Sequence, residues 1–159
     1  MHKKHHYKST IKWTGNLGTG TDHYKNYERS HTISVENKTI IEGSSDPAFL
    51  GDKTKHNPED MLLSALSSCH MLWYLHLCSA EGIIVTEYTD HATGIMIEQS
   101  NGSGYFSEVT LHPTVAVSHE SMIERAKNLH HKANEFCFIA QSVNFPVNHE
   151  DPIVFVQPL

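Results

Sequence analysis

The chain has 159 residues, about the size of one ordinary domain, and no linker separates two hydrophobic segments. Its apolar fraction of 38% is low, so the core must be concentrated in part of the chain. Twelve Lys and Arg against 18 Asp and Glu give a net charge of −6, which argues against a nucleic-acid surface, because such a surface needs a basic patch.

The segments that would direct a protein into or across a membrane are not expected here. The start MHKKHHYKSTIKW is basic but has no apolar stretch after it, so it does not resemble a signal peptide. No stretch of about 18 apolar residues lacks polar interruptions, as a transmembrane helix would require. We therefore expect a soluble, cytoplasmic protein, whose three cysteines are free, catalytic or metal-bound rather than structural disulfides.

The first third of the chain predicts two strands and a long loop. Residues 7–13 and 29–41 alternate well enough for edge-quality strands, and the Gly-, Thr- and Asn-rich stretch 15–22 forms a turn between them. Residues 43–56 have turn composition.

The strongest local signal is a helix start at Asn57. Asn57 suits the N-cap, Pro58 suits the first helical position, and Glu59 and Asp60 place negative charge in the first turn. The helix from Glu59 to about Ala80 has 13 apolar residues among the 18 from 61 to 78, so we expect burial on several sides. Gly82 ends it.

The remaining sequence predicts a hairpin, a second helix and two short strands. Residues 83–99 and 105–117 form the hairpin around SNGSG, and Pro113 within the second strand indicates an edge or a bulge. Apolar residues at helical spacing predict an amphipathic helix from Glu120 to about Cys137. Strands are expected at 142–147 and 153–156, which gives an α/β (α+β) fold.

The cysteines differ in their surroundings. Cys69 and Cys78 lie nine residues apart on one helix and face opposite sides, so they cannot share a metal or a disulfide within it. Cys78 lies among apolar residues and is interpreted as core packing. Cys69 follows Ser67 and Ser68, a polar gap that indicates a pocket or an interface groove. Cys69 with Cys137 is a candidate pair, but the sequence alone cannot bring them together.

These residues carry a resemblance to a known family. The stretch NPEDMLLSALSSCHMLWYLHL, with Glu59 ten residues before Cys69, resembles the cysteine segment of the OsmC/Ohr family of thiol peroxidases. Arg29 looks like the family's active-site arginine, and Cys137 in ANEFCFIA looks like its second cysteine. The order of elements is similar over nearly the whole chain.

The resemblance implies one OsmC-like domain over residues 1–159, in which antiparallel sheets pack around a buried central helix in an intertwined homodimer. Its parts would be strands and loop at 1–56, the central helix at 57–81, and the hairpin, second helix and closing strands at 83–159. Because 138–140 read Phe-Ile-Ala where the hydroperoxide-resistance branch has Pro-Tyr-Ser, the chain resembles an OsmC-like branch.

The implied activity is reduction of organic hydroperoxides to alcohols, and of hydrogen peroxide to water. Cys69 would be oxidised to a sulfenic acid and Cys137 would resolve it as a disulfide, with Arg29 and Glu59 shaping the thiolate site. No bound cofactor is implied, and an external lipoyl or thioredoxin-like dithiol would restore the enzyme.

Helix geometry adds one constraint. Ten residues separate Glu59 from Cys69 by about 15 Å along a helix, too far to meet in one site. Two such helices packed about a two-fold axis would bring Glu59 of one subunit near Cys69 of the other, so we expect composite sites at a dimer interface.

Other features have plainer interpretations. Fourteen histidines invite a metal site, but H-x-x-x-H spacing occurs only at the N-terminus, between His2 and His6, and no C-x-x-C or H-E-x-x-H spacing occurs, so we expect no metal and mostly surface histidines. Trp73, Tyr74 and Leu77 are interpreted as packing. Phe49 either walls an apolar pocket over Cys69 or anchors its loop. A redox sensor or small-molecule binding protein that uses the same cysteine pocket, and a chain whose thiols only fill the core, remain alternatives.

Overall fold

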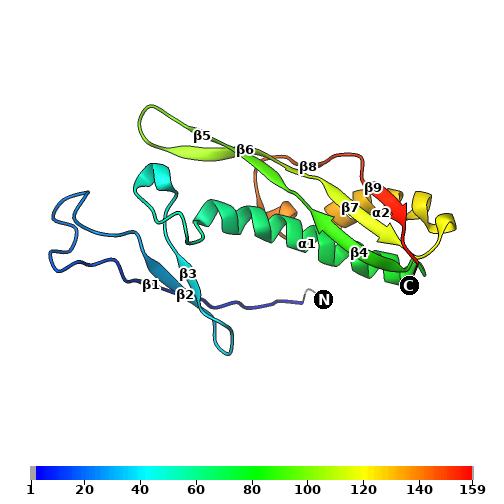
Figure 1. Ribbon diagram of the computed structural model, residues 1–159, viewed down its shortest axis with the longest axis horizontal. Helices are drawn as coiled ribbons and strands as arrows, with labels where there is room; N and C mark the ends of the chain where they lie inside the picture. The colour runs from blue at the N-terminus through cyan, green and yellow to red at the C-terminus, as the bar shows by residue number, and fades with distance from the viewer. Residues whose placement is uncertain (1–2, 159) are drawn as a thin grey trace. The chain divides into compact units, whose positions relative to one another are not determined.

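The computed structural model describes residues 3–158, and Figure 1 shows the order of the elements. The chain divides into two compact units, Met1–Met61 and Leu62–Leu159. The division falls inside the long helix α1 (Pro58–Ala80). The expectation of one domain over 1–159 stays a prediction.

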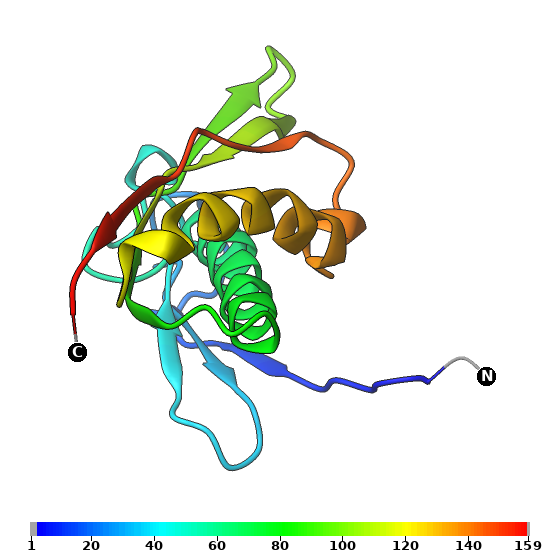
Figure 2. The same cartoon turned by 90° about the vertical axis from the view of Figure 1, so that its right-hand side faces the viewer.

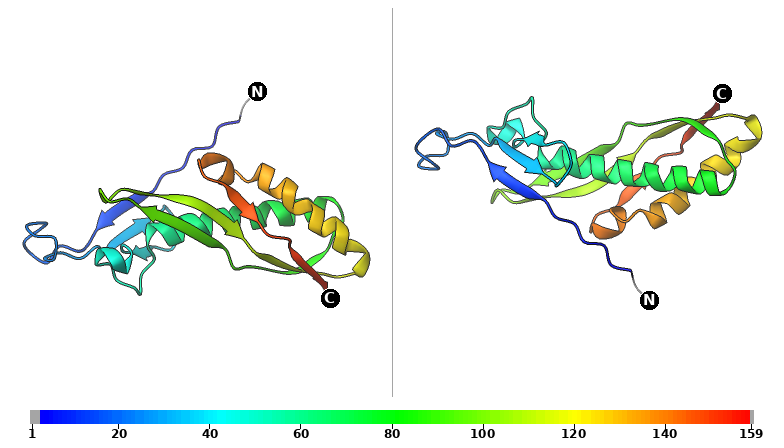
Figure 3. Two further views of the ribbon diagram at one scale, coloured as in Figure 1. Left: turned by 90° about the horizontal axis from the view of Figure 1, so that it is seen from above. Right: turned by 90° about the horizontal axis from the view of Figure 1, so that it is seen from below.

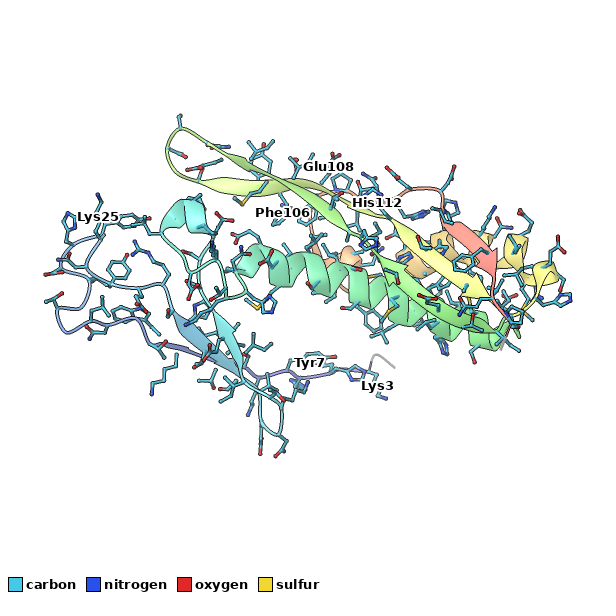
Figure 4. All side chains as sticks on the ribbon, in the orientation of Figure 1. Lys3, Tyr7, Lys25, Phe106, Glu108 and His112 are labelled. Carbon is cyan, nitrogen blue, oxygen red and sulfur yellow. The ribbon has the colours of Figure 1, made fainter. Side chains whose placement is uncertain are left out.

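The first unit contains a three-stranded antiparallel sheet. Its order is β1 (Thr10–Trp13), β2 (His31–Ser34) and β3 (Ile41–Gly43). The predicted strand at 29–41 was wrong in its extent, because a turn with Asn37 at φ 62° ends β2 before Ile41 begins β3. The predicted strand at 7–13 also begins late, and Tyr7, labelled in Figure 4, lies exposed on the extended segment before it. A short 3-10 helix η1 (Pro47–Phe49) follows β3.

The predicted start of α1 is confirmed. The Asn57 side chain accepts a hydrogen bond from the Asp60 backbone N–H at 2.7 Å, which satisfies one of the N–H groups left free at a helix start. Glu59 and Asp60 lie in the first turn, as expected. Gly82, just past the helix, has φ +67°, a conformation that glycine adopts without strain.

Within this chain α1 is fully buried along one face and half-buried along most of the rest, so the expected burial on several sides is met in part. Its buried residues are spaced by three or four along the helix, apart from one adjacent pair: Leu66, His70, Tyr74, Leu77 and Cys78. Leu72, on another face, is 63% exposed. By length and composition alone α1 could cross a membrane despite its serines and histidines, with a mean hydropathy of 1.2. This is weak evidence, because the core helix of a soluble protein passes the same test.

In the second unit each long strand of the predicted hairpin is divided in two. Residues 83–99 form β4 (Val85–Asp90) and β5 (Thr93–Glu98), and residues 105–117 form β6 (Gly104–Leu111) and β7 (Pro113–Val117). The second break lies at His112, directly before Pro113, which cannot donate a ladder hydrogen bond. At the same place the Asp90 carboxylate accepts the His112 backbone N–H at 2.7 Å. The two halves of the ribbon therefore belong to different sheets.

The C-terminal elements complete these sheets. A 3-10 turn η2 (Glu120–Met122) leads into α2 (Ile123–Phe136), with Cys137 at its C-cap. The predicted strand at 142–147 was wrong: η3 (Ala140–Ser142) and a loop precede β8 (Val147–His149). The predicted strand at 153–156 is β9 (Ile153–Val156). The sheets have the orders β4-β7-β9 and β5-β6-β8, in which the last pair of each is parallel.

The second unit builds its core between the strands and the two helices. Figure 2 shows α2 lying across α1, and Figure 3 shows α1 running along one side of the strands. One buried cluster joins α1, α2 and the β4-β7-β9 sheet, and includes Tyr74, Leu77, Cys78, Val115 and Leu129. A second contains Leu66, Val109 and Leu111. This mixed arrangement confirms the α+β fold class.

Candidate thiol site

The fold brings Cys69 and Cys137 together. Cys69 lies near the middle of α1 and is half-buried, whereas Cys137 at the end of α2 is 1% exposed. All three cysteines are free. Burial, followed by the interaction with the neighbouring Cys69 thiol, raises the pKa of Cys137 to about 11. Cys137 therefore keeps its proton at neutral pH, beside a thiol that solvent can reach.

Cys78 is a packing residue, as expected. It is fully buried in the cluster between α1, α2 and the sheet. Burial raises its pKa, and the side chain that interacts with it is Tyr74 rather than another thiol. Burial outweighs the opposing effect of Tyr74, so the net shift in the pKa of Cys78 is upward and the thiol is not activated as a nucleophile.

Three aromatic side chains that neighbour the two cysteines along the chain pack against one another. Trp73 follows Cys69 by one helical turn, and its ring lies 5.2 Å from Phe136 and 5.5 Å from Phe138 between ring centroids. Phe136 and Phe138 directly flank Cys137, and they are 44% and 66% exposed. A cavity of about 280 Å³ opens on this side of α1, lined by Leu72, Trp73 and His76. The packing role expected for Trp73, Tyr74 and Leu77 is confirmed, since Trp73 packs against the cluster that buries the other two.

Arg29 belongs to the first unit and is held by aromatic rings. Its guanidinium carbon lies 4.3 Å from the centre of the Tyr24 ring and 4.2 Å from that of Tyr27. It donates hydrogen bonds to the backbone carbonyls of the same two residues, at 2.7 and 2.6 Å. These bonds use two of the five guanidinium donors, and within residues 3–158 the other three make no hydrogen bond, so they could bind an anion.

Glu59 and Phe49 also lie in the first unit. Glu59 is half-buried in the first turn of α1, and within residues 3–158 no ion pair joins it to Arg29. Phe49 is half-buried in η1, and its carbonyl accepts a hydrogen bond from the Ser45 hydroxyl at 3.2 Å. Its role as a pocket wall stays a prediction.

The sequence analysis missed a group of buried histidines. Most histidines were expected at the surface, but His70 and His130 are 1% and 0% exposed and hydrogen-bond to one another at 3.0 Å between His70 Nε2 and His130 Nδ1. Their positions on the two helices could have predicted this burial. His70 shares a face with Leu66 and Tyr74, and His130 shares a face with Ala126 and Ala133. Within residues 3–158 no group of three or more His, Cys, Asp or Glu is arranged to hold a metal ion.

The polar residues on either side of Cys69 lie on two different faces of α1. Ser67 donates a short hydrogen bond to Asp90 of β4, which ties α1 to the strands, while His70 enters the core. A cavity of about 400 Å³ lies on this side of α1, and its lining includes Ser64, Ser67, Ser68, Asp90 and His91 but not Cys69. This cavity is therefore lined by residues next to Cys69 but by neither Cys69 nor Cys137.

The fold and the paired thiols define a class of protein, and the comparisons with known proteins identify it. The model of the OsmC-like protein family matches residues 51–150, so the chain belongs to the OsmC-like family. The recognition of the OsmC/Ohr family from the cysteine segment is thereby confirmed.

Solved structures agree over nearly the whole chain. An OsmC-like protein of unknown function from Vibrio cholerae is 31% identical, with a TM-score of 0.82 over 96% of this chain and 100% of that one. An organic hydroperoxide resistance protein from Elizabethkingia anophelis is 19% identical (TM-score 0.68; 99% of this chain, 100% of that one). Another, from Legionella pneumophila, is 14% identical (TM-score 0.67; 96% and 100%). The last two likenesses show the fold alone. No protein with curated annotation matches the chain.

Proposed function

We propose that this protein is a two-cysteine thiol peroxidase that reduces organic hydroperoxides, and hydrogen peroxide, to alcohols or water. One observation carries the proposal: a half-exposed thiol, Cys69, lies beside a buried, protonated thiol, Cys137, in an OsmC-like fold. Two of the solved structures that share this fold are named organic hydroperoxide resistance proteins, which supports a peroxide-related redox role.

The difference in exposure between the two thiols supports a different role for each. Cys69, as the thiol that a peroxide can reach, attacks as the thiolate on the terminal oxygen of ROOH, so the O–O bond breaks, Cys69 becomes a sulfenic acid and RO⁻ takes up a proton to leave as ROH. The Cys137 sulfur then attacks the Cys69 sulfur, a Cys69–Cys137 disulfide forms, and the hydroxyl leaves as water with the Cys137 proton. An external dithiol, lipoyl or thioredoxin-like, reduces the disulfide in the cytoplasm and is itself oxidised.

The surroundings of the thiols favour an apolar peroxide. Trp73, Phe136 and Phe138 present ring surface beside the cysteines, and ring surface stabilises an alkyl or aryl group by removing it from water. Hydrogen peroxide has no such group to bury. We therefore infer a preference for bulky organic hydroperoxides.

Arg29 and Glu59 are proposed to complete the site across a homodimer. On α1, Glu59 lies ten residues before Cys69, which corresponds to about 15 Å. Exposed Leu72 and the full burial of only one face leave apolar surface on α1 that a second copy would cover. In the dimer, Arg29 and Glu59 of one subunit would hold the thiolate and peroxide at Cys69 of the other, because guanidinium donors suit anionic oxygen and sulfur.

A single experiment separates this proposal from a redox sensor or a small-molecule binding protein. The purified protein is given excess cumene hydroperoxide with dihydrolipoamide, and peroxide consumption is compared between the wild type, Cys69→Ser and Cys78→Ser. Many turnovers in the wild type and Cys78→Ser, and none in Cys69→Ser, are the expected result. Oxidation that stops after one equivalent of peroxide would favour the sensor. If no peroxide is consumed, an alkylating reagent is added to the wild type, and equal, slow labelling of all three thiols would favour cysteines that only fill the core.

A further inference from the structure

Two buried imidazoles join the helices that carry the thiols. His70 Nε2 and His130 Nδ1 are 3.0 Å apart, and the rings are nearly parallel, with an interplanar angle of 9°. His130 is also stacked on Tyr74 at 3.9 Å between ring centroids. Both histidines are at most 1% exposed. In the described part of the chain this is the one hydrogen bond between side chains of α1 and α2.

The pair is electrically neutral at physiological pH. Burial lowers the pKa of His70 to about 4 and that of His130 to about 3, so neither ring is charged at pH 7. A neutral imidazole has one donor and one acceptor nitrogen, and the tautomers can therefore match in a single N–H···N bond. The titratable groups that face the pair come from all the packed elements: Tyr74 on α1, Tyr88 and Asp90 on β4, His131 on α2 and His149 on β8.

The pair lies next to the thiols along both helices. His70 directly follows Cys69, and His130 lies seven residues before Cys137, about 10 Å along the axis of α2. A hydrogen bond is directional, so it fixes both the separation and the rotation of the two helices in a way that apolar contact does not. A shift of α2 at His130 would carry Cys137 with it.

From this geometry we infer that His70 and His130 are positioning residues, whose bond holds α1 and α2 in the register that lets Cys137 reach Cys69 during disulfide formation. The inference rests on the proposed roles of the two cysteines. It adds a role for two residues that take no part in the bonds made and broken.

Formation of the Cys69–Cys137 disulfide tolerates little displacement of either cysteine. A disulfide requires an S–S distance of about 2.05 Å, a Cβ···Cβ distance of about 3.8 Å and a dihedral angle near ±90°. Misplacement of a reacting group by about 1 Å can cost on the order of 100-fold in rate. Attack of peroxide on Cys69 does not need Cys137, so loss of the histidine bond should affect resolution and spare the first oxidation.

The variants are chosen to remove or replace the two ring nitrogens that form the hydrogen bond. His130→Leu removes the nitrogen at similar volume, whereas His130→Asn places an amide atom near the Nδ1 position and can restore the bond. His131→Leu is the matched control, because His131 is the next residue on α2 and is exposed. A second pair, His70→Met and His70→Gln, tests the bond from the other helix, with Gln placing an amide atom near Nε2.

The first measurement uses no peroxide. Each protein is equilibrated with reduced and oxidised glutathione, and the Cys69–Cys137 disulfide is quantified by alkylation and mass spectrometry, the reaction being protein dithiol plus GSSG giving protein disulfide plus two GSH. We expect the equilibrium constant to fall at least tenfold in His130→Leu, to recover to within about threefold in His130→Asn, and to stay unchanged in His131→Leu. Circular dichroism checks that each variant folds. If His130→Leu does not fold, the same comparison between His70→Met and His70→Gln tests the inference.

The second measurement follows the reaction with one equivalent of cumene hydroperoxide, trapping the sulfenic acid with dimedone. We expect His130→Leu to form the sulfenic acid at the wild-type rate within about twofold and to form the disulfide at least tenfold more slowly. A folded His130→Leu protein with the wild-type glutathione constant would overturn the inference, as would a lowered constant that His130→Asn does not restore. A wild type that forms the disulfide in glutathione but never reacts with peroxide would refute the proposed function and leave the positioning role standing.

Discussion

Lowering the pH from 7 to 5 should destabilise the fold through its buried histidines. In the unfolded chain a histidine has a pKa of about 6.5, and in the fold burial lowers the pKa of His70 to about 4 and that of His130 to about 3. Below pH 6.5 the unfolded state therefore binds protons that the folded state does not. The stability is fully present above pH 6.5 and is lost as the pH falls towards 4.

The size of the effect can be worked from these values. At pH 5, about 1.5 units below the unfolded pKa, one such histidine removes about 2 kcal/mol at roughly 1.36 kcal/mol per unit. His130 can add up to the same again, although its ring shares one hydrogen bond with His70. Against a total stability of about 5–15 kcal/mol this loss is large, and 2 kcal/mol corresponds to a fall of about 4–8 °C in Tm.

Urea denaturation at pH 7 and pH 5 measures the effect, with His130→Leu and His131→Leu as the compared variants. Surface carboxylates titrate alike in all of them and cancel in the difference. The pH-dependent loss should be about 2 kcal/mol smaller in His130→Leu, which has one buried histidine fewer. It should change much less in His131→Leu, because the exposed His131 ring is only the last of the causes that lower the pKa of His130. Equal losses in the wild type and His130→Leu would refute the reasoning, since the buried ring would then not control proton uptake.

Three further outcomes are expected. Cys137→Ser should be oxidised once by peroxide and then accumulate a Cys69 sulfenic acid that dimedone labels, and a variant that still turns over would contradict the resolving role. Mixing inactive Cys69→Ser with inactive Arg29→Ala should restore about a quarter of wild-type activity. Half of randomly formed dimers are mixed, and each mixed dimer has one intact composite site out of two. Activity no higher than that of the separate variants would exclude a shared site. Asp90→Ala should lower the free energy of unfolding by about 2–3 kcal/mol in urea titrations, because the Ser67 hydroxyl and a backbone N–H lose their acceptor; a loss below 1 kcal/mol would mean that solvent replaces it.

The parts of the fold that sequence reasoning predicted were those with local causes. The cap at Asn57 and the conformation of Gly82 depend on a few neighbouring residues, and both were predicted correctly. The division of the hairpin strands has a partly non-local cause, since the Asp90 carboxylate bonds the His112 backbone across the ribbon. Pro113 gave the only local hint of that break.

In the candidate site, too, features with local causes were predicted and features that depend on helix packing were not. Residue spacing on one helix separated Cys78 from Cys69, and the structure agrees, but the approach of Cys137 to Cys69 depends on how α2 crosses α1. The histidine pair was missed because polar residues on apolar helix faces were interpreted one at a time, and their compatibility depends on the opposite helix. A buried polar residue is tolerated only with a partner, and the partner lies 60 residues away.

The two buried thiols show why position, rather than burial, determines reactivity here. Burial raises the pKa of both Cys78 and Cys137, so each is a poor nucleophile by itself. What distinguishes Cys137 is the thiol beside it: once Cys69 is a sulfenic acid, an electrophilic sulfur faces Cys137, and the proton of Cys137 can leave with the hydroxyl as water. Cys78 interacts with Tyr74, which supplies no such electrophile. The proposed resolving step would therefore depend on the packing of α2 against α1, and a substitution that separates these helices should abolish it without changing any cysteine.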